Sequence, residues 1–175
     1  MTDKLERIVL GGGCFWCVEA ALIQVPGVEE VTPGYAGGTT RNPSYKEVCG
    51  GLTGHAEVAR IEYDPGVVSL EEVLGYFFAM HDPTTPNRQG HDVGTQYRSI
   101  VLYDSKEQKE RVEGLIESIA GDFSRPIITQ VEPLEEFYPA EDYHHQYFEK
   151  NPRQAYCLAV VAPKVEKIRK KLTVK

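Results

Sequence analysis

The stretch Ile8-Val9-Leu10-Gly11-Gly12-Gly13-Cys14-Phe15-Trp16-Cys17 decides how the chain begins to fold. Its apolar run predicts a strand, its glycines predict a tight turn, and the amphipathic residues 18–25 predict a helix that opens at Cys14. A thiol there faces unpaired N–H groups and the positive end of the helix dipole, so we expect a favoured thiolate. The glycines would let another molecule approach the backbone closely. Together with the apolar faces of Phe15 and Trp16, this pattern indicates a soft nucleophile that meets a small apolar substrate.

The length and composition restrict the class of protein. A chain of 175 residues is expected to form one domain, residues 1–175, that buries roughly 70% of the surface exposed by its unfolded chain. Its 41% hydrophobic and 26% charged residues are ordinary for a soluble globular protein. The net charge of −7 argues against a nucleic-acid partner. No apolar run approaches the ~18 residues of a membrane span, and residues 1–7 lack the apolar region of a signal peptide. We therefore expect a cytoplasmic protein without a membrane partner.

Strands and helices alternate along the rest of the chain. After a first strand over residues 5–10, we expect strands over residues 29–35, 55–64, 97–103 and 127–131, and helices over residues 69–80, 105–120 and 141–150 and from Pro163. Capping boxes that start at Ser69 and Ser105 support two of these helices. Two long loops, 36–54 and 81–96, exceed the usual connection length, and loops of that size often carry function. The order predicts an α+β or mixed α/β domain.

The cysteines offer two kinds of chemistry. They stand at four positions, Cys14, Cys17, Cys49 and Cys157. Cys14-x-x-Cys17 suits a redox pair, because the second thiol can attack an oxidised first one, and it also suits half of a zinc site. A second such pair is missing, and His144-His145 lacks zinc-finger spacing, so metal is the weaker alternative.

Glu57 is the second candidate for chemistry. The alternation of a strand places Glu57 on the same face as Ala59, Ile61 and Tyr63, which is the more apolar face. If that face is buried, desolvation raises the pKa of Glu57 and keeps it protonated near neutral pH. A protonated carboxyl close to the Cys14 sulfur is a general acid. The alternative is a frayed strand end with a solvated carboxylate, and the residues alone leave both open.

Polar side chains at the loop ends provide further candidates. Tyr45 lies in the first long loop, and Tyr97 stands where the second loop meets a strand, so their phenols could donate hydrogen bonds into a site. Asp92 could fix such a network or merely cap its loop. His144 or His145 could pair with a cysteine as in a cysteine hydrolase, although adjacent histidines diverge and at most one would serve.

A series of short motifs carries a resemblance to a known family. The motifs are Gly13-Cys-Phe-Trp16, Gly34-Tyr-Ala-Gly-Gly38, Asn42-Pro-Ser-Tyr45, Gly54-His-Ala-Glu57, His81-Asp-Pro83, Arg88-Gln-Gly90, the run from Asp92 to Arg98, Ala140-Glu141, Tyr143-His144 and Asn151-Pro152. In order and spacing they resemble the A-type peptide-methionine sulfoxide reductases, which reduce the S epimer of methionine sulfoxide. The resemblance covers nearly the whole chain and implies a two-layer α/β sandwich, a ferredoxin-like α/β roll with a mixed sheet and long active-site loops.

The resemblance also implies a catalytic role for four residues. Cys14 would attack the sulfoxide sulfur and become a sulfenic acid, while Glu57 would protonate the oxygen and Tyr45 and Tyr97 would hydrogen-bond to it. Phe15 and Trp16 would form the apolar wall for the S-methyl group.

By the same resemblance, Asp92 would help to orient the substrate. No metal or organic cofactor is implied, and thioredoxin or a similar dithiol would be the reductant.

The second, resolving cysteine is open. Cys17 lies one helical turn from Cys14, where many relatives have glycine, and Cys157 matches the place of a C-terminal resolving cysteine. Either could resolve, or both could act as a relay, and we favour Cys157 as the first, on a mobile segment of residues 151–175. Cys49 is expected to be structural.

Two other functions remain open from the residues alone. A general dithiol–disulfide oxidoreductase would explain Cys14-x-x-Cys17 but would leave Glu57 and the aromatic wall without a role. A zinc-stabilised interaction module would use the cysteines as metal ligands.

Overall fold

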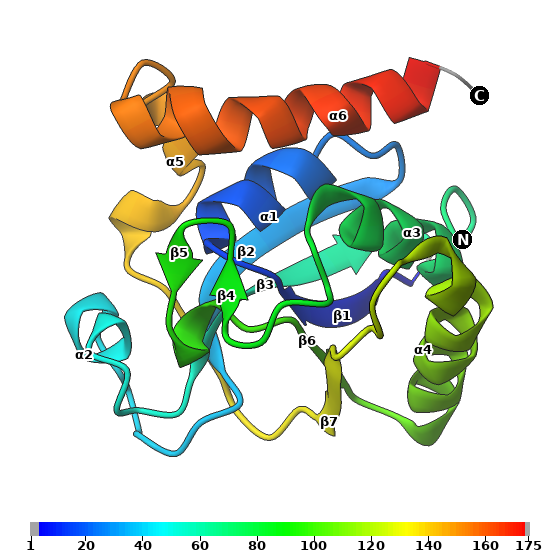
Figure 1. The fold of residues 1–175 in the computed structure, drawn as a ribbon, viewed down its shortest axis with the longest axis horizontal. Helices are drawn as coiled ribbons and strands as arrows, with labels where there is room; N and C mark the ends of the chain where they lie inside the picture. The colour runs from blue at the N-terminus through cyan, green and yellow to red at the C-terminus, as the bar shows by residue number, and fades with distance from the viewer. Residues whose placement is uncertain (1–3, 174–175) are drawn as a thin grey trace.

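A mixed β-sheet lies at the centre of the molecule (Figure 1). The structure is a computed structural model, and it describes residues 4–173. Within them the main sheet has the strand order β7-β6-β1-β3-β2-β8, and β6 and β7 are its parallel neighbours while the other pairs are antiparallel. The strands are β1 (Glu6–Gly11), β2 (Val28–Ala36), β3 (Ala56–Tyr63), β6 (Ile100–Tyr103), β7 (Gln130–Pro133) and β8 (Phe137–Pro139).

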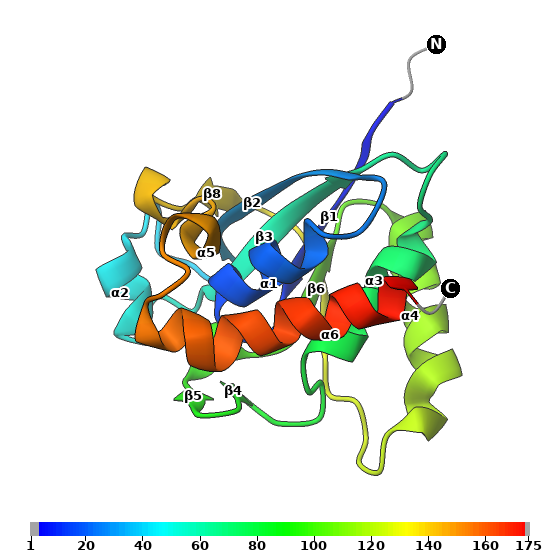
Figure 2. The same cartoon turned by 90° about the horizontal axis from the view of Figure 1, so that it is seen from above.

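Helices cover one face of this sheet, which gives the two layers that the sequence predicted. The long helices are α1 (Phe15–Leu22), α3 (Leu70–Met80), α4 (Lys106–Ile119) and α6 (Ala162–Thr173). In Figures 1 and 2, α1 lies between the sheet and α6, and α4 flanks the sheet beside β6 and β7. The α+β sandwich with a mixed sheet is therefore confirmed. None of the helices within residues 4–173 combines the length and the apolar character that crossing a bilayer requires.

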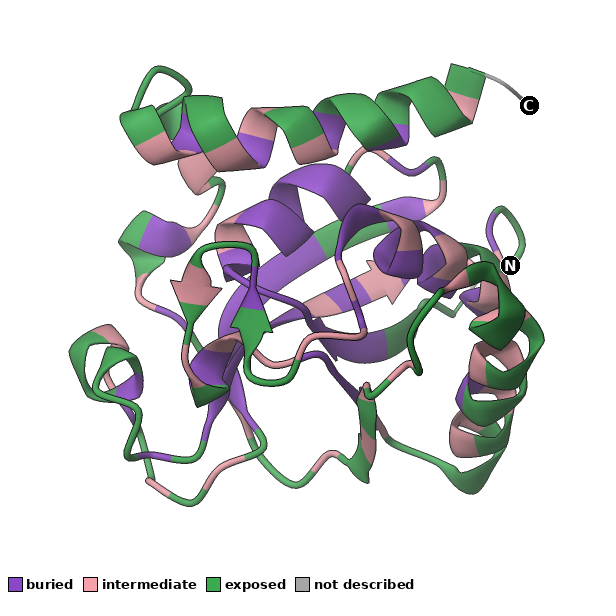
Figure 3. Cartoon of the chain, in the orientation of Figure 1, coloured by how far each residue is buried: buried purple, intermediate pink, exposed green. Residues whose placement is uncertain are grey.

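Helix α1 is enclosed rather than amphipathic. Seven of its eight residues are buried, because the sheet covers one side and α6 covers the other. The amphipathic pattern expected for residues 18–25 was therefore wrong, and Figure 3 shows α1 buried along nearly its whole length. A consequence is that even Glu19, a charged residue in the middle of the helix, lies inside the protein.

The central strands are buried on both faces. Ala59, Ile61 and Tyr63 of β3 pack in the large cluster under the helices. Val58 faces the other way, into a smaller cluster that also contains Val9, Ala36, Ala56, Ile100 and Leu102 and is covered by Leu134 and Phe137. Glu57 was assigned by alternation to the face of Ala59, Ile61 and Tyr63, which is thus the face covered by helices. This face is buried, so Glu57 does not lie at a frayed, solvated strand end.

The two long loops contain short elements that the sequence analysis missed. Residues 36–54 include α2 (Tyr45–Cys49), which starts at a capping box formed by Ser44 and Glu47. Residues 81–96 include the hairpin of β4 (Arg88–Gln89) and β5 (Asp92–Val93) and run into a single helical turn, Thr95–Tyr97. The helix expected over residues 141–150 is divided into two turns, Asp142–His144 and α5 (Tyr147–Lys150). These elements bring the loops against the N-terminus of α1.

Candidate active site

The glycine turn places Cys14 at the N-cap of α1. A Cβ on Gly12 would lie 2.7 Å from the His81 ring, and a Cβ on Gly13 would lie 2.8 Å from the Gln89 side chain. Gly13 also has a φ of +86°, which other residues adopt with strain. The groups that approach the glycines are therefore the chain's own, and the expectation that the turn admits another molecule was wrong.

The Cys14 thiol is almost enclosed, with 6% of the residue exposed. Burial raises its pKa well above the ordinary value, and the charges of Glu57 and Cys17 raise it further. The backbone N–H of Trp16 and the nearby Tyr156 hydroxyl act in the opposite direction. The resting form of Cys14 is therefore the thiol, and not the thiolate that the helix terminus alone predicted.

Glu57 lies on strand β3 and interacts with this thiol. Its carboxyl is fully buried, and its Oε1 atom accepts a 3.1 Å hydrogen bond from the backbone N–H of Phe15 in the first turn of α1. Burial raises the pKa of Glu57 to about 8, although the Phe15 N–H and the Cys14 thiol lower it. Its Oε2 atom has no hydrogen-bond partner within residues 4–173. The carboxyl is thus protonated at neutral pH and has one oxygen available.

Tyr156 is a site residue that the sequence analysis missed. Its hydroxyl donates a 2.5 Å hydrogen bond to Oδ2 of Asp92. The same hydroxyl interacts with the thiols of Cys14 and Cys17, and burial raises its own pKa. The only sequence signal was its position directly before Cys157. Tyr156 therefore links the predicted substrate-orienting carboxylate to the predicted nucleophile.

The two predicted wall residues differ in accessibility. Phe15 is fully buried and packs against the rings of Tyr45 and His144, at centroid distances of 6.2 and 4.9 Å. Trp16 is half-buried, and its ring stacks on Tyr147 at 3.7 Å with an interplanar angle of 5°. Of the two predicted wall residues, Trp16 thus keeps some exposed surface, whereas Phe15 keeps none.

Neither histidine of the His144-His145 pair acts on Cys14. His144 is buried, and its Nδ1 atom accepts a 2.9 Å hydrogen bond from the indole N–H of Trp16. Burial lowers its pKa to about 4, so the ring is neutral at pH 7. His145 lies 3.2 Å from the Ala140 carbonyl. The pairing of a hydrolase, which the sequence had left open, is therefore not formed.

Both predicted phenols face Glu57. Burial raises the pKa of Tyr45 and of Tyr97, and the charge of Glu57 is the next cause in both cases. The backbone N–H of Tyr45 donates a 2.9 Å bond to Glu141, and the carbonyl of Tyr97 accepts a 3.2 Å bond from the N–H of Gly13. Both tyrosines are thus fixed beside the carboxyl through their backbones.

The four cysteines are all free thiols. Cys17 is fully buried, and its electrostatic influence reaches Cys14; burial raises the pKa of Cys17 to about 11. Cys157 is also buried and lies in the π-helical turn Cys157–Val161, which contacts α1. Among residues 4–173, no group of three His, Cys, Asp or Glu side chains has the arrangement of a metal site.

Cys49 lies near the site and not in the core. It is exposed, and its thiol interacts with the Tyr45 hydroxyl. The Glu57 charge also acts on it. Because Cys49 is exposed, the structure gives no support to the structural role expected for it.

Comparison with known proteins places this arrangement in a family. Residues 6–175 match the family described as peptide methionine sulfoxide reductase. The peptide methionine sulfoxide reductase MsrA of Trichodesmium erythraeum is 54% identical over 168 residues, which cover 95% of each chain. The solved structure of Mxr1 from Saccharomyces cerevisiae in reduced form is 38% identical with a TM-score of 0.84, over 90% of this chain and 91% of that one.

A second solved structure, Mxr1 from Saccharomyces cerevisiae in complex with Trx2, is 26% identical with a TM-score of 0.61 and covers 84% of this chain and 87% of that one. Sequence and structural similarity thus agree over most of the chain. The chain belongs to the peptide methionine sulfoxide reductase family.

Proposed function

We propose that this protein reduces methionine-S-sulfoxide, in proteins or free, to methionine. The observation that carries the proposal is the position of Glu57 next to Cys14. Its buried carboxyl accepts a 3.1 Å hydrogen bond from the N–H of Phe15, the residue that follows Cys14, and burial raises its pKa to about 8. A sulfoxide oxygen is a poor leaving group until it is protonated, so thiol attack on the sulfur requires an acid of this kind beside the nucleophile.

The proposed step transfers oxygen between two sulfur atoms. The Cys14 sulfur attacks the sulfoxide sulfur, Glu57 gives its proton to the oxygen, and Glu57 regains a proton from the thiol. The hydroxyl then passes to the Cys14 sulfur, as the bonds of the substrate sulfur to oxygen and to Cys14 break. Cys14 is oxidised by two electrons to a sulfenic acid, and the substrate sulfur is reduced by two electrons as methionine leaves. The Tyr45 and Tyr97 phenols would donate hydrogen bonds to the oxygen as its charge develops.

The apolar part of the substrate would lie against Trp16, with Phe15 behind it. Asp92 would orient the substrate from the hairpin, and its bond with Tyr156 supports a position close to Cys14. No metal or organic cofactor enters this scheme.

A second cysteine then condenses with the sulfenic acid and releases water. The electrostatic coupling of Cys17 to Cys14 and their shared contact with Tyr156 support Cys17 as the first partner, with Cys157 as a relay from the C-terminal segment. This order differs from the preference for Cys157 that the sequence suggested. Thioredoxin would reduce the disulfide, as the complex of yeast Mxr1 with Trx2 supports. We place the protein in the cytoplasm, where thiols are kept reduced.

The test is turnover of a methionine sulfoxide peptide with dithiothreitol as reductant. Wild type should form methionine and Cys14→Ser should not, and equal product from both would overturn the proposal. Because Cys14-x-x-Cys17 also suits a general dithiol–disulfide oxidoreductase, insulin reduction is measured in parallel. Strong insulin reduction without sulfoxide turnover would favour that second function.

A further inference from the structure

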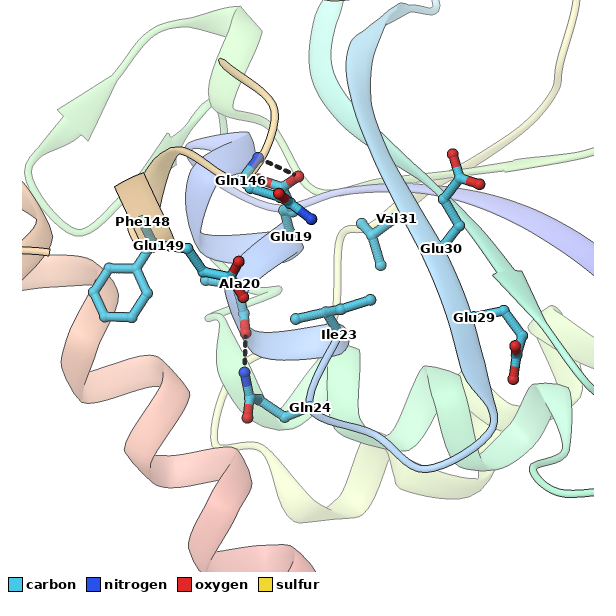
Figure 4. A pocket seen from close by; sticks show the side chains of 10 residues that line it. All are labelled: Glu19, Ala20, Ile23, Gln24, Glu29, Glu30, Val31, Gln146, Phe148 and Glu149. Carbon is cyan, nitrogen blue, oxygen red and sulfur yellow. Dashed lines mark hydrogen bonds between the residues drawn. The ribbon is translucent and has the colours of Figure 1, made fainter. Parts of the chain in front are cut away.

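Glu19 is a buried carboxylate that the proposed reaction does not use. It lies in the middle of α1, and only 5% of the residue is exposed. Its Oε2 atom accepts a 2.8 Å hydrogen bond from the backbone N–H of Gln146, and the backbone N–H of Tyr147 also donates to the carboxylate. Figure 4 shows the Glu19 side chain reaching from α1 to Gln146 at the edge of a small cavity. One carboxylate therefore holds the backbone at two successive residues.

The backbone that Glu19 holds is unusual. Gln146 has a φ of 55°, in the left-handed region that residues other than glycine rarely adopt. It is also the N-cap of α5, and the first N–H groups of a helix lack partners within the helix. The Glu19 carboxylate supplies the missing acceptor from outside α5. The strained turn and the start of α5 thus both depend on this side chain.

The next side chain after this turn, Tyr147, packs on Trp16, one of the two residues of the predicted wall. Tyr147 stacks on Trp16 at 3.7 Å with nearly parallel rings. Trp16 and Glu19 both come from α1, three residues apart. Two side chains of α1 therefore contact Tyr147. Glu19 accepts a hydrogen bond from the Tyr147 backbone, and Trp16 stacks on the Tyr147 ring.

We propose that Glu19 is a positioning residue for the substrate wall: it fixes the backbone of residues 146–147 and so seats the Tyr147 ring on Trp16. This inference rests on the proposed function, because Trp16 matters only as the surface that receives the substrate. Glu19 itself touches neither the substrate nor the reacting sulfur atoms.

The charge of Glu19 makes this role sensitive to pH. Burial raises its pKa to about 7, against the two backbone hydrogen bonds that lower it. The charged groups that face it are Glu149 and Lys150 from α5 and Glu29 and Glu30 from β2, the last two across the small cavity. A carboxylate accepts both N–H bonds more strongly than a carboxylic acid does. We therefore expect the Tyr147 ring to be held more rigidly on Trp16 above pH 7 than below it.

The experiment uses the single tryptophan of the chain, Trp16, as the reporter. Emission of Trp16 is titrated between pH 5.5 and 8.5 in wild type, in Glu19→Gln, and in a matched control, Glu149→Gln, whose side chain is exposed at the same cavity. We expect wild type to change emission with a midpoint near pH 7 and Glu19→Gln to lose that transition. The control should keep the transition at a somewhat lower pH, because it lacks the Glu149 charge that raises the pKa of Glu19. The amide retains one acceptor oxygen, so this variant should still fold, which circular dichroism checks.

Steady-state kinetics with a methionine sulfoxide peptide supply the second measurement. Glu19→Gln should raise KM about threefold to tenfold and change kcat by less than about twofold, because binding is affected more than chemistry. Tyr147→Leu should raise KM in the same way. In the double variant the two effects should not add, since both act through the same ring.

Each outcome bears on the inference. A folded Glu19→Gln protein with wild-type emission, pH response and KM would overturn it, as would additive KM effects in the double variant. The emission titration needs no turnover, so it distinguishes a failure of this inference from a failure of the proposed function. If wild type reduces no sulfoxide while its emission follows Glu19, the proposed function fails and the positioning of Tyr147 stands.

Discussion

The Tyr156 hydroxyl donates a 2.5 Å hydrogen bond to Asp92, which joins the segment before α6 to the β4–β5 hairpin. The same hydroxyl interacts with the thiols of Cys14 and Cys17. One phenol therefore interacts with the predicted nucleophile, with the Cys17 thiol and with the predicted substrate-orienting carboxylate.

Removal of this hydroxyl should slow the chemical step. Tyr156→Phe keeps the ring beside Trp16 but loses the donor to Asp92 and the interaction that lowers the Cys14 pKa. We expect the single-turnover rate of sulfoxide reduction to fall roughly tenfold, the size of one hydrogen bond to a charged group. The rate is measured by rapid quench without reductant. Tyr103→Phe, a half-buried tyrosine at the far end of β6, is the control and should match wild type.

Glu57→Gln should leave the fold intact and slow sulfoxide reduction by roughly 10²- to 10⁴-fold, because an amide cannot supply the proton. In wild type the single-turnover rate should fall as the pH rises through about 8, where Glu57 loses its proton. The variant should lack this alkaline decline. A Glu57→Gln protein with wild-type rates would remove Glu57 from the acid role.

Glu57 should also shape the pH dependence of stability. Its pKa is about 8 in the folded protein and 4.5 in a free side chain, so the folded state holds one more proton between these values. The stabilisation is therefore complete below about pH 4.5 and is lost as the pH rises through 8. Urea titrations should show that Glu57→Gln becomes more stable relative to wild type by up to about 1.4 kcal/mol per pH unit in that window. A constant difference would contradict the raised pKa.

Two buried histidines have the opposite effect on the pH dependence of stability, at acidic pH. Burial lowers the pKa of His81 and of His144 to about 4, below the value of 6.5 for a free imidazole. Their contribution is therefore present above about pH 6.5 and is lost as the pH falls through 4. The comparison of wild type with Glu57→Gln cancels both contributions, because the two proteins share these histidines.

Mass spectrometry after one turnover without reductant should identify the resolving cysteine. We expect a disulfide between Cys14 and Cys17 in wild type and one between Cys14 and Cys157 in Cys17→Ser. A disulfide between Cys14 and Cys157 as the first product of wild type would show that the C-terminal segment moves before Cys17 reacts. A disulfide to Cys49 in wild type would contradict both routes.

The local parts of this site were predictable from the sequence. The glycine turn, the helix start at Cys14 and the buried face of Glu57 each follow from the spacing of neighbouring residues. The short helix α2 also had a local signal, the capping box of Ser44 and Glu47, which the many polar and glycine residues around it obscured.

The remaining contacts depend on docking between distant segments. Tyr156 and Glu19 acquire their partners only when residues 140–160 fold back onto α1, and no periodicity in either segment encodes that contact. The resting protonation of Cys14 is a similar case. A helix terminus predicts a thiolate, but enclosure by the sheet and by α6 raises the pKa more than the terminus lowers it.

The hydrogen bond from the Phe15 N–H to Glu57 has a consequence for the catalytic cycle. The amino end of α1 directs this N–H at the acid, while the N–H of Trp16 is directed at the nucleophile. The Phe15 N–H therefore favours an anion that exists only briefly, after the oxygen has taken its proton and before the thiol has replaced it. The helix would lower the energy of that short-lived ion pair while leaving the idle enzyme uncharged.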